Sequence, residues 1–184
     1  MNEKKRKMLN VLIEELDESE DFEEISLFTA EELGAPADIA RALISDVGSE
    51  LIDVLGEFLF MPYKDEEMLY FTSVITLTDE IMADEQVDIA LAVARINYVI
   101  PNGCFSLGEN GKSLVYRYTV PIPADLKDDD IKAMMLTAVD AALTVVDRFE
   151  GFLSLVIEGN LSPEEMMTII TGTSENEEQS GKEE

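Results

Sequence analysis

The side chains in this sequence that could do chemistry are almost all carboxylates. Its 184 residues include 40 Asp and Glu, 13 Lys and Arg, one cysteine and no histidine. Histidine is the side chain most used for acid–base catalysis near neutral pH and the commonest metal ligand. Catalytic triads and zinc sites are therefore nearly excluded, and Cys104 has no histidine partner that would generate its thiolate.

Five acids cluster where a loop is expected to run into a helix, namely Asp79, Glu80, Asp84, Glu85 and Asp88. Mg²⁺ and Ca²⁺ prefer carboxylate oxygens, so this cluster is a candidate divalent-metal site. Its spacing lacks the alternating positions and the glycine of an EF-hand loop, and a capped, solvated helix start explains it without a metal. The run from Asp128 to Asp130 has the same two explanations. We expect no metal and no cofactor; a metal-dependent enzyme or a Ca²⁺-responsive switch is the alternative.

The glycines form no phosphate-binding motif. Gly103, Gly108 and Gly111 belong to predicted hairpin turns. No Gly-x-x-x-x-Gly-Lys or Gly-x-Gly-x-x-Gly follows a strand and opens a helix. The sequence therefore predicts a protein that binds rather than catalyses.

Hydrophobic periodicity predicts the elements that position these residues. Residues 85–158 read as helix, strand, Asn-Gly hairpin, strand, turn and one long helix. Pro121 and Pro123 lack backbone donors, so their strand should end there or lie at an edge. The long helix carries an apolar stripe formed by Ile131, Met135, Ala138, Ala142, Val145, Phe149, Phe152 and Val156. Such a helix needs cover from a sheet and from another helix or a second subunit.

Two strands precede that run, over residues 51–61 and 68–78, because apolar and other residues alternate there at period two. We expect these strands to pair antiparallel. Over residues 84–99 the period becomes that of a helix, which fits best as a helix covering a sheet. Its apolar positions are Val87, Leu91, Ala94 and Tyr98 on one stripe, with Ile89, Val93 and Ile96 beside it.

The N-terminal part is less regular. Residues 1–20 predict an amphipathic helix whose basic start and acidic end oppose the helix dipole, so it should fray unless it is packed. Its run Lys4 to Lys7 resembles the start of a signal peptide, but the apolar stretch that follows is too short for one. Residues 21–48 could begin as strand or helix, and Pro36 with the residues up to Ile44 favours a short helix.

These patterns divide the chain into three parts. Residues 1–50 are expected to form a helical segment. Residues 51–171 are expected to form an α+β domain that closes with a helix after Ser162 and Pro163. Residues 172–184 are polar and rich in glutamate, so we expect a disordered acidic tail.

The formal net charge is −27. Such a charge repels nucleic acid and anionic membranes, and no segment approaches the ~20 apolar residues of a membrane span. The charge can serve solubility alone, attract a basic protein partner or client, or mimic nucleic acid. A single cysteine provides no disulfide framework, so a reducing cytoplasm is the expected location.

Apolar side chains on the two C-terminal helices are the candidate partner-binding residues. Methionine repacks easily and suits an adaptable groove, and filling of the core is the alternative. The candidates are Met134, Leu136, Val139, Leu143, Met166, Met167 and Ile170.

Five local strings carry a resemblance to a known family, namely Ile89 to Val99 with Asn97, Cys104 to Leu107, Leu114 to Tyr118, the Pro121/Pro123 turn, and Ala141 to Phe149. Over about residues 51–158 the chain resembles the bacterial YbjN family, which is described as a regulator of sensory transduction and is similar in fold to type III secretion chaperones. The resemblance implies helices on a small antiparallel sheet, a protein that is commonly dimeric, and no catalytic residues. We therefore expect a cytoplasmic, non-enzymatic protein-binding module, chaperone-like or regulatory, that could form a homodimer.

Overall fold

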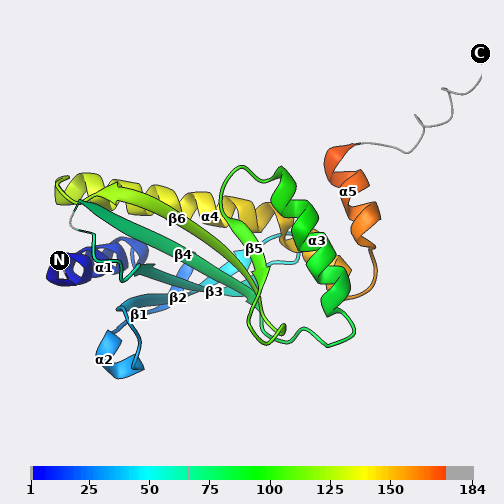
Figure 1. The fold of residues 1–184 in the computed structure, drawn as a ribbon, viewed down its shortest axis with the longest axis horizontal. Coiled ribbons are helices and arrows are strands. Elements are labelled where there is room, and N and C mark those ends of the chain that lie inside the picture. Colours follow the sequence, from blue (N-terminus) through cyan, green and yellow to red (C-terminus); the bar gives the residue numbers. More distant parts are fainter. Residues whose placement is uncertain (1, 66, 173–184) are drawn as a thin grey trace, which may run out of the picture.

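A six-stranded antiparallel sheet organises the fold within residues 2–65 and 67–172, which the computed structural model describes (Figure 1). The strand order is β1-β2-β3-β4-β6-β5. The elements are α1 (Asn2–Leu16), β1 (Phe22–Phe28), α2 (Ala30–Leu33), β2 (Ile39–Val47), β3 (Ile52–Phe60), β4 (Met68–Thr78), α3 (Gln86–Val99), β5 (Cys104–Leu107), β6 (Leu114–Pro123), α4 (Asp128–Ile157) and α5 (Pro163–Thr171).

The α+β class predicted from the sequence is confirmed, as are the elements from residue 51 onward. Strands β3 and β4 pair antiparallel, and β5 and β6 form the predicted hairpin around Asn110 and Gly111. Gly111 has a φ of 72°, which this turn requires. The expected disordered tail lies outside the described residues, apart from Gly172 at the end of α5.

The expected helical segment over residues 1–50 is wrong beyond α1. Apart from the four-residue α2, residues 21–48 form β1 and β2, and β2 pairs with β3 across the boundary expected at residue 50. The helix expected up to Ile44 is a strand because Ala40, Ala42 and Ile44 alternate toward the core. Burial and pairing in the sheet outweigh the helix signal of Pro36.

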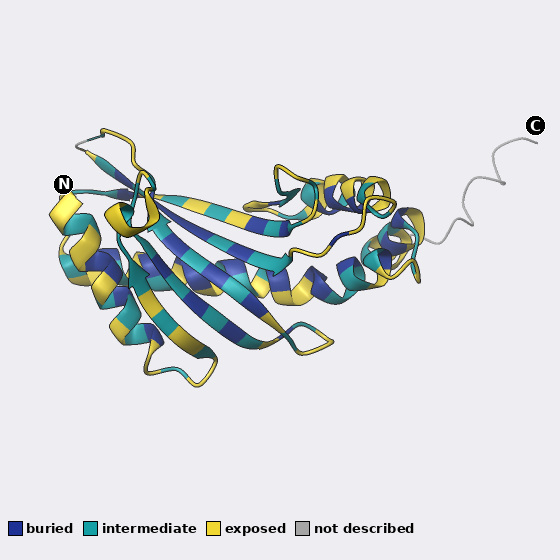
Figure 2. Ribbon diagram, turned by 90° about the horizontal axis from the view of Figure 1, so that it is seen from below, coloured by how far each residue is buried: buried dark blue, intermediate teal, exposed yellow. Residues whose placement is uncertain are grey.

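Helices α1 and α4 cover one face of the sheet, and α4 lies behind the strands in Figure 2. The predicted stripe of α4 is buried except at Val145 and Phe152, which are half-buried. The other face, called the open sheet face, carries half-buried aliphatic side chains such as Leu43, Leu55 and Val74. No helix of the described chain packs on that face.

The basic run at the start of α1 fastens this helix to the rest of the fold. The Lys4 Nζ donates to the carbonyl oxygen of Ala124 at 2.7 Å, and the Lys5 Nζ donates to that of Met61 at 2.8 Å. The Lys7 ammonium lies 2.6 Å from the Asp128 carboxylate and lowers the pKa of that group. These contacts hold α1 in place although its charges oppose the helix dipole.

The acids at the start of α4 do not act as the caps that the sequence suggested. The N-cap residue is Lys127, which makes no side-chain capping hydrogen bond, and Asp128 to Asp130 occupy the first turn. Negative charge in that turn still complements the helix dipole.

The free edges of the sheet are obstructed. At β1 a bulge between Glu23 and Ser26 places Glu24 at a φ of 49°. The predicted edge position of Pro121 is confirmed, because β5 reaches only as far as Arg117 along β6. Charges, bulges and prolines are the means by which sheets avoid pairing with another strand.

The edge of β5 is closed by a side chain of α3. The Asn97 Nδ2 donates to the carbonyl oxygen of Phe105 at 2.9 Å, and its Oδ1 accepts from the Phe105 amide at 2.8 Å. The Asn97 carboxamide thus makes the two hydrogen bonds that a neighbouring strand would make. This pair of bonds fixes the position of α3 against the sheet.

We expect Asn97→Ala to lower the free energy of unfolding by about 2–4 kcal/mol, because two half-buried backbone groups lose their partners. Urea unfolding followed by circular dichroism measures the loss. Asn102→Ala is the matched control, since the Asn102 side chain is exposed. Equal stability of the two variants would show that the Asn97 bonds do not hold α3.

Candidate protein-binding surface

Helix α3 presents an apolar face to solvent, which we call the α3 ridge. The exposed fractions are 68% for Val87, 46% for Leu91 and 90% for Tyr98. Ala90 and Ala94 lie between them and are also exposed. Residues at these spacings share one side of a helix, so the ridge is continuous over three turns.

The local sequence explains why α3 has an apolar face left over. Ile89, Ala92, Val93 and Ile96 are buried. Of the two stripes seen in the sequence, the structure buries the one with Ile89 and leaves the one with Val87 exposed. A helix at the surface normally carries polar residues on its outer side. The two stripes together give α3 more apolar surface than its fold needs.

Acids border the N-terminal end of the ridge. Asp79, Glu80, Asp84 and Asp88 are exposed, and the Glu85 Oε2 accepts a hydrogen bond from the Met82 amide at 2.8 Å. Within residues 2–65 and 67–172, no group of three acids or cysteines could hold a metal ion. The geometry therefore gives the metal alternative no support, and Asp84 and Asp88 lie within one helical turn of Val87 at the start of the ridge.

The seven candidates from the sequence fall into three groups. Val139 and Met166 are 1% and 0% exposed, so the prediction that they contact a partner is wrong: both belong to the core. Met134 is exposed and lines a shallow groove with Tyr118 and Val120. The others, which are half-buried against the core, are Leu136, Leu143, Met167 and Ile170.

The lone cysteine, Cys104, is exposed at the start of β5. The described part of the chain also contains no helix of sufficient length and apolarity to span a membrane.

Glu150 is a buried carboxylate on α4. It is 0% exposed, its Oε1 accepts from the Ser154 hydroxyl at 2.6 Å, and its Oε2 has no hydrogen-bond partner among the described residues. Gly48 lies directly over it, because a Cβ at that position would come within 2.2 Å of Oε2. A buried polar atom without a partner costs free energy on folding.

We expect Glu150→Gln to raise the free energy of unfolding by about 1–3 kcal/mol, because the change removes a buried charge and keeps the shape of the side chain and an acceptor for Ser154. Urea titration measures the change, with Glu14→Gln at an exposed position of α1 as the control. A less stable Glu150→Gln variant would contradict the idea that this carboxylate is a cost to the fold.

No family model, curated protein or solved structure matches this chain. The resemblance to the YbjN family stays a prediction.

Proposed function

We propose that this protein is a non-enzymatic binding module that holds an amphipathic helix of a basic protein partner on the α3 ridge. The observation that carries the proposal is the exposure of Val87, Leu91 and Tyr98 on one side of a helix. Exposed contiguous apolar surface is typical of protein-interaction sites. Aromatic side chains such as Tyr98 are enriched among the residues that dominate binding energy.

Charge argues for a basic partner. The chain carries −27, and acids such as Asp84 and Asp88 border the ridge. A partner with lysines or arginines beside its apolar face would be attracted over a distance and oriented on arrival. A second copy of this chain would bring another −27 to the same place, so like-charge repulsion disfavours it there. The homodimer implied by the resemblance stays a prediction.

The obstructed sheet edges argue for a helix rather than a strand as the docking element. The bulge with Glu24, the Asn97 carboxamide and Pro121 each oppose an added strand. Ala90 and Ala94 are small, exposed residues between the larger side chains of the ridge. Small residues let a second helix pack closely by placing its side chains between those larger ones.

A model peptide tests the proposal. A helical peptide with leucines on one side and lysines on the other is added to the isotope-labelled protein, and amide chemical shifts are recorded. We expect shifts concentrated on residues 87–98, and no binding by the same peptide with glutamates in place of lysines. Shifts spread over the acidic surface without the ridge, or equal binding of both peptides, would overturn the proposal.

A further inference from the structure

A cavity with a volume of about 560 Å³ lies at the opposite end of the molecule from α3. It opens between the first turns of α1, the segment around α2 and the chain that follows β3. Small-molecule sites commonly have volumes of about 300–1,000 Å³. The size of this cavity is therefore that of a ligand site.

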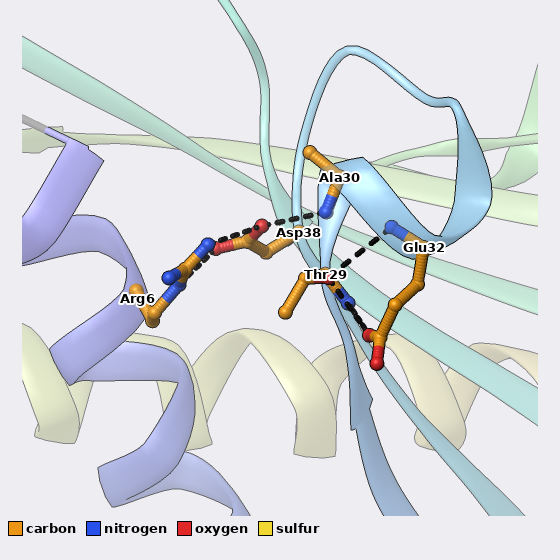
Figure 3. A network of polar contacts seen from close by, with 5 residues as sticks. All are labelled: Arg6, Thr29, Ala30, Glu32 and Asp38. Atoms are coloured by element: carbon orange, nitrogen blue, oxygen red, sulfur yellow. Dashed lines mark hydrogen bonds and ion pairs between the residues drawn. The ribbon is translucent and has the colours of Figure 1, made fainter.

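One wall of the cavity is held by a network of polar contacts (Figure 3). The Arg6 guanidinium reaches both oxygens of Asp38, at 2.7 and 3.2 Å, and Asp38 also accepts from the Ala30 amide at 2.8 Å. Thr29 and Glu32 form a capping box beside it. The hydrogen bond from Arg6 lowers the pKa of Asp38, so this acid stays ionised, and its oxygens are engaged by Arg6 and the Ala30 amide.

Two further cations line the cavity without a carboxylate partner among the described residues. The Lys5 Nζ donates to the Met61 carbonyl oxygen, and burial lowers the pKa of Lys5. Lys64 makes no ion pair in the described structure. The remaining acid, Asp65, directs its Oδ1 to the amides of Glu67 and Met68, at 2.9 and 3.1 Å.

The charge of the cavity is opposite to that of the chain. Its charged lining consists of three cations and two anions, a net +1, whereas the whole chain carries −27. Lys5 and Lys64 line the same cavity and neither pairs with an acid among the described residues, so their positive charge is available to an anion. The apolar part of the lining includes the exposed Pro36, Pro62 and Tyr63, and the core residues Leu9 and Phe60 close it on the inside.

We infer that this cavity is a binding site for a small amphipathic carboxylate, whose acid group is held by Lys5 and Lys64 and whose apolar body lies against Pro36, Pro62 and Tyr63. A single negative charge fits better than a phosphate dianion because the rest of the chain repels anions in proportion to their charge. The site goes beyond the proposed function, since it shares no residue with the α3 ridge.

Octanoate is the probe for this site. It is titrated into the labelled full-length protein, and octanol and inorganic phosphate are titrated in parallel. We expect octanoate to shift the amides of residues around 5, 37 and 63 and to bind at least about tenfold more tightly than either of the other two compounds, since only octanoate combines charge with an apolar body. Absence of these shifts, or octanol or phosphate binding as tightly as octanoate, would overturn the inference.

Lysine variants provide the second readout. Lys5→Gln keeps a donor for Met61 and is expected to weaken octanoate binding about tenfold or more, because the lost charge is partly buried. The exposed Lys64→Gln should weaken it about twofold to fivefold. Lys112→Gln removes the same charge from the distant β5–β6 turn and should change nothing. Wild-type affinity in both cavity variants would overturn the inference.

Discussion

Leu91→Asp is expected to weaken binding of the leucine–lysine peptide at least about thirtyfold, which corresponds to a central interface residue worth about 2 kcal/mol. Leu91 lies in the middle of the α3 ridge, between Val87 and Tyr98. An aspartate there would lose its hydration in the apolar contact and gain no hydrogen-bond or ion-pair partner in exchange. Fluorescence anisotropy of a labelled peptide measures the loss.

The same substitution separates an apolar contact from simple attraction between opposite charges. Leu91→Asp makes the protein more acidic, so a purely electrostatic complex with the basic peptide would become tighter. Leu33→Asp adds the same charge on α2, where the exposed fraction of Leu33 is 38% against 46% for Leu91. Equal affinities of the two variants, or a tighter complex with Leu91→Asp, would contradict docking on the ridge.

Gly103→Ala is expected to lower the free energy of unfolding by about 3 kcal/mol or more, because strain and a steric clash act together. Gly103 has a φ of 66°, in the left-handed region. A Cβ at this position would lie 2.2 Å from the Tyr116 Oη and 2.7 Å from the backbone oxygen of Arg117. The backbone oxygen belongs to β6 and cannot move without disturbing the sheet.

The Tyr116 side chain cannot easily move away from a Cβ at position 103 either. It is 0% exposed, its hydroxyl donates to the Asn102 carbonyl oxygen at 2.7 Å, and burial raises its pKa to about 12. Gly159→Ala is the matched control, since Gly159 has a φ of 70° but open space around its Cα. It should cost only about 1–2 kcal/mol of backbone strain. Urea unfolding of both variants measures the difference, and equal losses would show that the clash is relieved elsewhere.

The elements that could be predicted are those whose apolar pattern fits only one kind of secondary structure. Alternation along 68–78 and the stripe of α4 define a strand and a helix because burial on one face produced both patterns. In β2 the inward positions include Ala40 and Ala42, which suit a helix as well as a strand. Only pairing with β3, a contact that local sequence does not reveal, decides between the two.

The candidate sites were harder to find for a similar reason. Met166 looked like a binding residue because methionine suits grooves, yet its position beneath α3 is set by tertiary packing. The α3 ridge did leave a signal, since two apolar stripes on one helix exceed what one sheet can cover. The cavity left none, because Lys5 and Lys64 are separated by 59 residues and meet only in the folded chain.

The fastening of α1 also determines when this helix can find its place during synthesis. Lys4 bonds to Ala124, Lys7 to Asp128 and Glu15 to Lys132, at sequence separations of 120, 121 and 117 residues. A ribosome adding about 5–20 residues per second needs roughly 6–24 seconds to supply those partners. The first helix to leave the ribosome can pack on β1 to β3 early, but its contacts with α4 and with the chain before α4 form only after those residues have emerged.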